Sequence, residues 1–383
     1  MRKTKVLMVM GSTGMAGTQM FVLNLVENMD LTRFQVDFAV DRGDDGTGIG
    51  KRLRELGCNI YFLPYFKVYN YFGYVKSWKK FLSKHHYDIV HGHSSNSAAI
   101  YLKIAKQMGC VTIAHSHSSG YRGGLLPRLF KKVFAKGAGK VADYWFACSD
   151  IAAERLYGDA YKRYPFYYNI PNAINMDAFR YNYDKRQRVR SMLNVPDDEL
   201  LCGHVGTLMP QKNHSFIMEI MAEVVKINPK SKLVCCGTGP LMEKVNKKAR
   251  SLGIEDHIIF AGVVHNANEY MMAMDVMVFP SFNEGFPVTI IEAEATGLPV
   301  VMSDTITTEI DLTDLVHRQS LTDSAHEWAA TVCSVKHGDR VFYNKVLSDT
   351  KYNVRSGAQF VSSLYDKSMS KKKDNGKEKN CLS

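Results

Sequence analysis

The sequence lacks the patterns of membrane-spanning, secreted and zinc-stapled proteins. None of its 383 residues lies in a run that approaches the about 18 apolar residues of a spanning helix. The apolar run at residues 6–10 is too short for a signal-peptide core, although Arg2 and Lys3 precede it. The eight cysteines form no C-x-x-C pair, and Cys235 and Cys236 are adjacent in an apolar run. We therefore expect a cytoplasmic protein whose cysteines are small core residues in a reducing compartment.

Positive charge is in excess, with a formal net charge of +11. Such a charge favours an anionic membrane or a nucleic acid as partner. Two segments, residues 65–87 and 121–140, combine lysine and arginine with aromatic and apolar residues and contain no acid. Basic segments of this kind suit an anionic bilayer surface, and no recognisable nucleic-acid module accompanies them. We predict contact with an anionic membrane and none with nucleic acid; lysines that only solvate packed helices are the alternative.

The order of apolar runs predicts an α/β protein with two domains. A chain of this length with 45% hydrophobic residues can form two cores. Short apolar runs separated by helical segments indicate open, mainly parallel sheets that are covered on both faces. The expected strands span residues 6–10, 34–40, 60–64, 89–93, 111–115, 144–147, 200–206, 233–236, 258–262, 276–280 and 300–302. We expect domains at residues 1–170 and 171–348, a helix at 349–368 that crosses back to the first domain, and a disordered basic tail at 369–383.

Residues 283–301 form the unit on which the functional prediction depends. Pro287 suits the first position of a helix that follows the strand at 276–280. Glu284 on the loop and Glu292 in the helix are eight positions apart, which is roughly 12 Å and too far for the carboxylate pair of a glycoside hydrolase. The helix start between them suits phosphate. These features indicate a nucleotide sugar held at both ends, and a surface helix with solvated acids is the alternative.

Two other features lie at strand ends of the first half. A glycine-rich loop at residues 11–18 follows the first strand and lets backbone approach a phosphate, although a plain tight turn fits as well. His91 and His93 end one strand, and His115 and His117 end the next. Two His-x-His pairs without a cysteine or an acidic ligand nearby are a poor metal site, so we expect no metal. Imidazoles that cap strand ends through backbone hydrogen bonds are the alternative to a functional role.

The sequence Glu284-Gly285-Phe286-Pro287, followed by Glu292-Ala293 and Gly297-Leu298-Pro299, resembles the Glu-x7-Glu signature of retaining family 4 glycosyltransferases. The resemblance covers the chain up to about Lys367, and its closing part is similar to the bacterial exopolysaccharide and capsular polysaccharide branch. It implies the GT-B fold, in which two Rossmann-like doubly wound domains face a cleft. The first domain then serves the acceptor and the second binds the nucleotide sugar.

The resemblance also implies roles for single residues. Glu284 and His115 become the catalytic residues that position the donor sugar, with His117 as a second candidate. One position departs from the family pattern, because Thr207 stands where an arginine usually clamps the diphosphate. The residues implied in donor binding are Gly17, Lys212, Gly237, Val263, Gly285, Phe286 and Glu292.

The predicted activity is that of a hexosyltransferase. The enzyme would move a sugar from a nucleotide sugar, which we predict to be a UDP-sugar, to the hydroxyl of a lipid-linked or oligosaccharide acceptor with retention. It would need no metal or other cofactor, and it would lie at the inner face of the plasma membrane. A nucleotide-sugar 2-epimerase of the same fold and a non-catalytic sugar- or membrane-binding scaffold are the alternatives.

Overall fold

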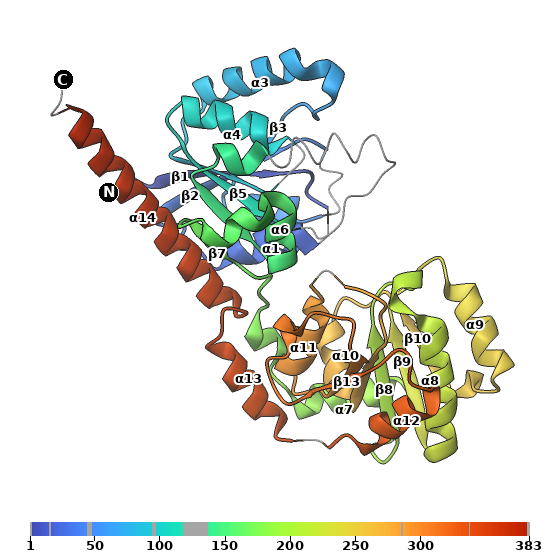
Figure 1. The fold of residues 1–383 in the computed structure, drawn as a ribbon. Helices are drawn as coiled ribbons and strands as arrows, with labels where there is room; N and C mark the ends of the chain where they lie inside the picture. The colour runs from blue at the N-terminus through green and yellow to red at the C-terminus, as the bar shows by residue number, and fades with distance from the viewer. Residues whose placement is uncertain are drawn as a thin grey trace. The chain divides into compact units, whose positions relative to one another are not determined.

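The computed structural model describes residues 2–14, 17–43, 48–93, 97–117, 137–284, 286–336 and 338–380. The chain divides into two compact units (Figure 1). Unit 1 comprises Met1–Ala173 together with Val354–Ser383, and unit 2 comprises Ile174–Asn353. The division after Ala173 lies three positions beyond the expected domain boundary at residue 170.

Within its described residues, unit 1 contains a seven-stranded sheet in the order β3-β2-β1-β4-β5-β6-β7. All its strand pairs are parallel. Continuous apolar runs form these strands because helices bury both faces of the sheet. The short edge strand β7 lies where the sequence predicted only a linker. The strands are β1 (Thr4–Met10), β2 (Phe34–Val40), β3 (Ile60–Phe62), β4 (Ile89–Gly92), β5 (Val111–Ser116), β6 (Tyr144–Ala147) and β7 (Tyr167–Asn169).

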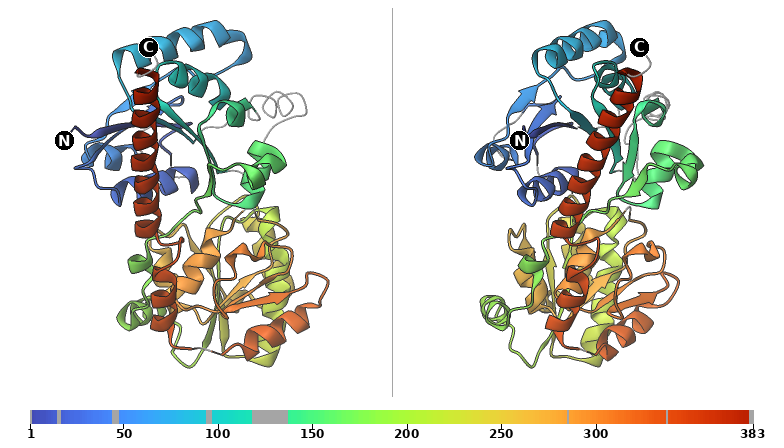
Figure 2. Two further views of the ribbon diagram at one scale, coloured as in Figure 1. Left: turned by 60° about the vertical axis from the view of Figure 1, so that its left-hand side comes forward. Right: turned by 90° about the vertical axis from the view of Figure 1, so that its left-hand side faces the viewer.

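Two groups of helices cover this sheet. One face packs against α1 (Gly17–Glu27), α2 (Gly50–Glu55) and α14 (Val354–Asn380). The other packs against α3 (Tyr71–Lys84), α4 (Ala98–Gln107) and α6 (Asp150–Tyr157). The views in Figure 2 show α14, in dark red, running along unit 1. Unit 1 is thus a doubly wound α/β domain to which the C-terminal end of the chain contributes a helix.

Helix α14 is longer than the sequence predicted. Ala358, Val361, Leu364 and Tyr365 are buried in the core of unit 1. The helix continues to Asn380, so it includes residues 369–380, for which the low apolar content had predicted disorder. A helix that is anchored by packing extends at low cost because each further residue adds one hydrogen bond, and lysine and glutamate are good helix formers.

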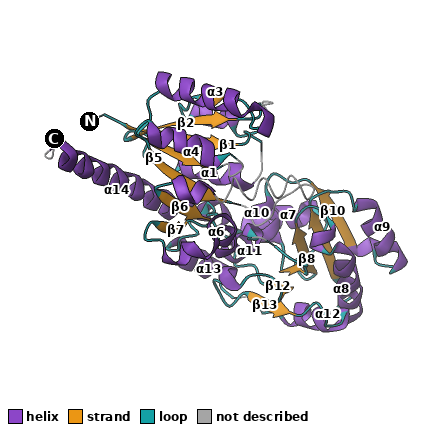
Figure 3. Ribbon diagram, turned by 45° about the horizontal axis from the view of Figure 1, so that its top comes forward, coloured by secondary structure: helices purple, strands orange, loops and turns teal. Residues whose placement is uncertain are grey.

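Unit 2 contains, in its described part, a six-stranded parallel sheet in the order β10-β9-β8-β11-β12-β13. One face packs against α7, α10, α11 and α13, and the other against α8, α9 and α12 (Figure 3). The sequence did not predict β13. The strands are β8 (Leu200–Val205), β9 (Ser231–Cys236), β10 (Ile258–Gly262), β11 (Val276–Phe279), β12 (Val300–Ser303) and β13 (Val316–Gln319).

The remaining elements connect these strands. None of the seven cysteines in the described ranges forms a disulfide, and six of them are buried as small core residues. None of the helices described here is long and apolar enough to cross a bilayer. The helices of unit 2 are α7 (Tyr183–Met192), α8 (His214–Ile227), α9 (Met242–Ser251), α10 (Ala267–Ala273), α11 (Val288–Ala295), α12 (Ala325–Ser334) and α13 (Arg340–Ser348). Short 3-10 helices lie at Val68–Asn70, Gly158–Arg163, Met176–Phe179, Pro210–Lys212, Glu255–His257 and Thr308–Ile310.

A buried charge network ties α7 to the sheet of unit 2. The side chain of Arg190 is 1% exposed, and its Nη1 lies 3.1 Å from Asp275 Oδ2. Arg186 Nη2 lies 2.7 Å from the other oxygen of Asp275. The backbone N–H of Leu201 in β8 also donates to Asp275, at 2.7 Å. One carboxylate therefore pairs with two arginines and orders the start of a central strand.

We expect Asp275→Asn to lower the free energy of unfolding by about 3 kcal/mol, because it leaves buried arginine charge without its partner. Urea denaturation at pH 7 measures this change. The control is Asp198→Asn, whose partner Lys230 and own side chain are 70% and 65% exposed. An exposed pair contributes about 0 to 1 kcal/mol. Equal losses in the two variants would contradict the assigned role of Asp275.

Candidate active site

The first part of the site is an ion pair at the strand ends of unit 2. Strands β8 and β11 are parallel neighbours, so the loops that follow them meet at the same edge of the sheet. Lys212 follows β8 and Glu284 follows β11, and Lys212 Nζ lies 2.8 Å from Glu284 Oε1. The two side chains are only 17% and 11% exposed. Glu284 Oε1 nevertheless has no partner in hydrogen-bond geometry, so the pair holds the charges together without satisfying that oxygen.

Gln211 holds the loop that carries Glu284. Its side-chain amide donates to the carbonyl of Asn283 at 2.6 Å and to Glu284 Oε2 at 3.3 Å. Its backbone carbonyl accepts from the N–H of Phe282 at 2.9 Å. The sequence did not predict Gln211 as a site residue, because its hydrogen-bond partners are more than 70 positions away. Its position beside Lys212 was the one local signal for such a role.

Helix α11 starts next to this pair. It begins at Val288, and Pro287 is its N-cap residue, one position earlier than predicted. No side chain caps the helix start, but the N–H groups of Val288 and Ile290 donate to the carbonyl oxygens of Phe286 and Pro287 at 3.0 Å. The helix start therefore offers a ligand mainly the positive end of its dipole. Phe286 packs against the core of unit 2 and lies parallel to Tyr352, with ring centroids 6.0 Å apart. Phe286 thus anchors the turn, while Gly285 lies outside the described residues.

The two glutamates in α11 have different surroundings. Glu294 is fully buried and accepts hydrogen bonds from the backbone of Leu312 and from the backbone and hydroxyl of Thr313. Burial raises the pKa of Glu294 to about 8. Glu292 is partly exposed, and no described residue donates to its carboxylate. Its apolar surroundings raise the pKa of Glu292 to about 7. Oε1 of Glu294 therefore ties α11 to the fold while its Oε2 has no hydrogen-bond partner among the described residues, and in Glu292 neither oxygen has one.

Glycines bring the ends of β8, β9 and β10 close together. Gly237 has a φ of +141°, and a Cβ there would lie 2.1 Å from the carbonyl oxygen of Gly206. Its N–H donates to the carbonyl of Gly262 at 2.7 Å. The backbone approach itself therefore requires Gly237, whatever ligand lies beside it. Val263 is 66% exposed just after β10, and Thr207 is exposed just after β8, so both are open to solvent at this edge.

In unit 1, the predicted histidines form two ring-to-ring hydrogen bonds. His91 Nε2 lies 3.1 Å from His115 Nδ1, and His93 Nδ1 lies 2.8 Å from His117 Nε2. Burial lowers the pKa of His91 to about 3 and that of His117 to about 4, and it holds the other two pKa values well below their usual range. The four rings are therefore neutral at physiological pH. They bond to one another, which differs from the backbone caps considered above.

The histidines also define the one described group with ligand atoms close enough for a metal. Nitrogens of His91, His93 and His115 all lie within 4.8 Å of one another. The ring centroids of His91 and His115 are 5.2 Å apart with an interplanar angle of 9°. This centroid distance nearly equals the distance between the two bonded nitrogens plus the radius of each ring. The two rings therefore lie edge to edge, with these nitrogens pointing at each other. In this arrangement His91 Nε2 and His115 Nδ1 are paired with each other.

Gly17, the last of the predicted donor-site residues, is the first residue of α1. A Cβ at Gly17 would meet nothing within 4 Å, so its backbone lies open. The preceding loop is held by Gln19, whose amide donates to the carbonyl and hydroxyl oxygens of Ser12 at 3.3 Å. Met15 and Ala16 lie outside the described residues.

Two family models match the chain. Residues 15–177 match the model "Glycosyltransferase Family 4", and residues 199–335 match "Glycosyl transferases group 1". The chain belongs to the family 4 glycosyltransferases. The family and the enzyme class predicted from the sequence are thereby confirmed, whereas the roles of single residues stay predictions.

Known proteins resemble this glycosyltransferase over most of its length. EpsF of Bacillus subtilis (strain 168), named as a glycosyltransferase, is 27% identical, and the match covers 96% of this chain and 97% of EpsF. The UDP-Gal:α-D-GlcNAc-diphosphoundecaprenol α-1,3-galactosyltransferase of Escherichia coli is 27% identical over 59% of this chain and 60% of its own. The crystal structure of Anabaena HepE in complex with UDP has a TM-score of 0.78 at 14% identity and covers 95% of this chain and 100% of HepE. The last similarity confirms the predicted fold.

The raised pKa of Glu292 predicts a pH-dependent stability. Folding raises the pKa of this carboxyl group from 4.5 to about 7. Its favourable contribution to the free energy of unfolding is therefore complete below pH 4.5 and is lost as the pH rises through 7. Glu292→Gln removes the ionisation. Because Glu292 keeps some solvent access, we expect a gain in unfolding free energy of about 1 to 2 kcal/mol at pH 8 relative to pH 5.

Chemical denaturation at the two pH values measures the gain. Glu243→Gln serves as the control, because the side chain of Glu243 is 82% exposed and pairs only with Lys247 among the contacts described. A Glu292→Gln variant with the same pH dependence as the wild type would contradict the assigned surroundings of Glu292.

Proposed function

We propose that this enzyme transfers a hexose from a UDP-sugar to a hydroxyl of a lipid-linked glycan, with retention of anomeric configuration, in the synthesis of an exopolysaccharide or capsule. The observation that carries the proposal is the Lys212–Glu284 pair beside the uncapped start of α11, with the unpaired Glu292 in the same helix. This edge of unit 2 offers a cation and the positive end of a helix dipole for phosphate and two carboxylates for sugar hydroxyls.

Each group has a defined part in the proposed reaction. The diphosphate of the donor attracts Lys212, which frees Glu284 to accept a hydrogen bond from the donor sugar, and Glu292 accepts from the ribose. The bond from the anomeric carbon to the phosphate oxygen breaks, and the acceptor oxygen bonds to the same face of that carbon. The leaving phosphate takes the acceptor proton. Lys212 and the α11 dipole stabilise the charge that develops on this phosphate, and Thr207 adds none.

The comparisons support the donor and the acceptor classes. HepE is described in complex with UDP, and the name of the Escherichia coli relative gives both a UDP-sugar and a diphosphoundecaprenol acceptor. An acceptor of that kind resides in a membrane, so the enzyme has to work at a bilayer surface. We propose the inner face of the plasma membrane.

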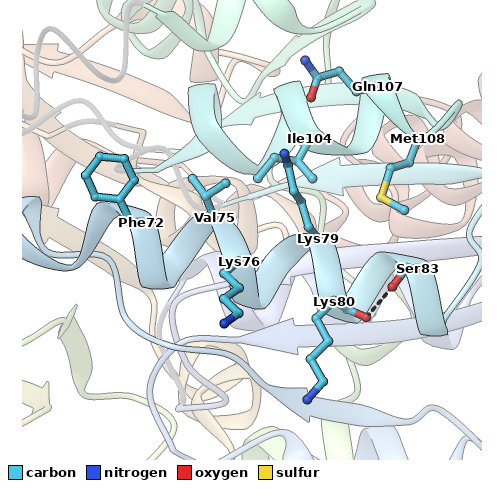
Figure 4. Close-up of a pocket in the computed structure, with 9 residues that line it drawn as sticks. All are labelled: Phe72, Val75, Lys76, Lys79, Lys80, Ser83, Ile104, Gln107 and Met108. Atoms are coloured by element: carbon cyan, nitrogen blue, oxygen red, sulfur yellow. Dashed lines mark hydrogen bonds between the residues drawn. The ribbon is translucent and has the colours of Figure 1, made fainter.

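Helix α3 supports a membrane contact. It buries Tyr74, Trp78, Phe81 and Leu82 against the sheet. Phe72 is 86% exposed at its start, and Tyr69 just before it is 82% exposed. Figure 4 shows Lys76, Lys79 and Lys80 projecting from α3, together with Phe72. Packing explains the buried face of this helix but not exposed aromatic rings among lysines, which suit an interfacial position. The second basic segment, residues 121–140, lies largely outside the described residues.

The donor prediction is tested with substrate-site variants. We expect UDP-sugars to raise the melting temperature and to support transfer, with weaker or no effect of GDP- and ADP-sugars. Glu284→Gln should lower kcat/KM by about 100-fold, because it removes a charged contact to the reacting sugar. Glu292→Gln should mainly raise the KM of the donor, and the exposed Glu243→Gln should change neither. No response to any nucleotide sugar would overturn the proposal, and an epimerised donor formed without an acceptor would favour the 2-epimerase.

The membrane prediction is tested by flotation with vesicles that contain anionic phosphatidylglycerol. We expect salt-sensitive binding that Lys76→Glu/Lys79→Glu/Lys80→Glu abolishes, because each lysine contributes about 1 kcal/mol near such a surface. A second variant with the same charge change at α9, Lys244→Glu/Lys247→Glu/Arg250→Glu, should still bind. Equal loss in both variants would show that net charge, and not α3, determines the binding.

A further inference from the structure

The four histidines of unit 1 form two stacked layers. Strands β4 and β5 are parallel neighbours, and residues two apart on a strand face the same side of the sheet. The pair His91–His115 forms one layer and the pair His93–His117 the other. The layers contact each other face to face, with ring centroids 4.2 Å apart between His91 and His93 and 4.0 Å apart between His115 and His117. The edge of Phe21 in α1 packs against the ring of His115, at 5.2 Å.

The first layer is anchored by a hydroxyl group whose direction of hydrogen bonding can be assigned. The hydroxyl of Tyr365 in α14 lies 2.6 Å from His91 Nδ1, and this tyrosine is fully buried. No other hydrogen bond to that hydroxyl involves a described residue. If the hydroxyl accepted a proton from His91, its own hydrogen would remain unpaired in the core, at a cost of about 1 to 3 kcal/mol. The tyrosine is therefore the donor, and burial raises its pKa, so it keeps its proton.

This donor fixes the protons of the whole layer. Each neutral imidazole carries one proton, on either nitrogen. Because His91 Nδ1 accepts from Tyr365, the proton of His91 is on Nε2, which then donates to His115 Nδ1. The proton of His115 is therefore on Nε2, and this buried nitrogen has no hydrogen-bond partner among the described residues. The carbonyl of Ile170 faces the His115 ring but not in hydrogen-bond geometry.

We propose that Tyr365 and His91 are positioning residues that set the tautomer of His115, so that His115 presents Nε2–H as a hydrogen-bond donor to an oxygen of the bound sugar. The inference rests on the proposed function together with the prediction from the sequence that His115 helps to position the donor sugar. It gives a role in the reaction to two further residues, His91 and Tyr365, which lie 274 positions apart in the sequence. It also defines the chemistry of the contact, because an Nε2–H group selects a hydroxyl or phosphate oxygen that can accept.

The second layer gives an internal comparison. His93 Nε2 and His117 Nδ1, its outer nitrogens, have no hydrogen-bond partner among the described residues. Asn172 faces His117 without forming a hydrogen bond in good geometry. Within the part of the chain that the structure describes, no hydroxyl fixes the direction of the hydrogen bond in this layer, so the loss of Tyr365 should affect His115 and leave His93 and His117 unchanged.

The direct test is the tautomer of His115 in the full-length protein. Long-range 1H–15N correlation spectra of protein labelled with 15N-histidine distinguish the two tautomers, and His115→Asn assigns the signal. We expect the Nε2–H form in the wild type and a mixture or the Nδ1–H form in Tyr365→Phe. The control, Tyr87→Phe, also loses a buried hydroxyl, which bonds to Asp37 at 3.0 Å, and should leave the signal unchanged. An Nδ1–H form in the wild type, or no change in Tyr365→Phe, overturns the proposal.

This measurement needs no substrate, so it separates the relay from the proposed function. If the tautomer behaves as expected but no nucleotide sugar binds, the proposed function fails and the hydrogen-bond relay stands. Thermal unfolding of each variant sets the temperature at which the spectra are recorded, so a less stable Tyr365→Phe protein is still measured in its folded state.

Kinetics test the contact to the sugar. We expect Tyr365→Phe to lower kcat/KM for transfer about 3- to 10-fold, the effect of one neutral hydrogen bond. In a His115→Ala background the same substitution should have no further effect, because the relay then has no end group. A purely structural role of Tyr365 would lower kcat/KM equally in both backgrounds, and that result would contradict the assignment.

Discussion

Desolvation is the constraint on which the functional groups of both units depend. At the carboxyl ends of two parallel sheets, polar side chains lie in surroundings with little water, where an unpaired charge is costly. The structure meets this cost in three ways. Lys212 and Glu284 pair their charges, the four histidines stay neutral and bond to one another, and Glu292 takes a raised pKa. Among these groups, Glu284 Oε1 and His115 Nε2 are buried without a hydrogen-bond partner in the described residues.

The same constraint separates functional from structural acids. Glu294 is more deeply buried than Glu292, and two backbone N–H groups and a hydroxyl donate to its Oε1, which links α11 to the loop before β13. Both oxygens of Asp275 have partners, from two arginines and a backbone N–H. A low-dielectric site strengthens any contact that a phosphate or sugar hydroxyl makes there, which is what transfer of a charged leaving group requires.

Helix α14 links packing to chemistry in unit 1. Its buried residues complete the core beneath the sheet, and from that position Tyr365 reaches His91. A side chain locked by the packing of a helix can hold a hydrogen bond in one direction, which a loop residue or a water molecule does less reliably. Tyr365 in α14 is therefore one of the residues that position His115. The packing of the helix holds its hydroxyl in place.

The sequence by itself determined the order of most strands along the chain, because apolar runs, turn residues and motif spacing are local. For the same reason it placed Glu284, Lys212 and His115 at strand ends and Glu292 in a helix. It did not determine that Lys212 bonds to Glu284, that Gln211 holds the loop, or that the histidine rings bond to each other. Strands β7 and β13 and the last turns of α14 were also missed, since short edge strands and polar helical segments have weak local patterns. Contacts between residues that lie 70 to 270 positions apart depend on which strands become neighbours, and only the tertiary structure decided that.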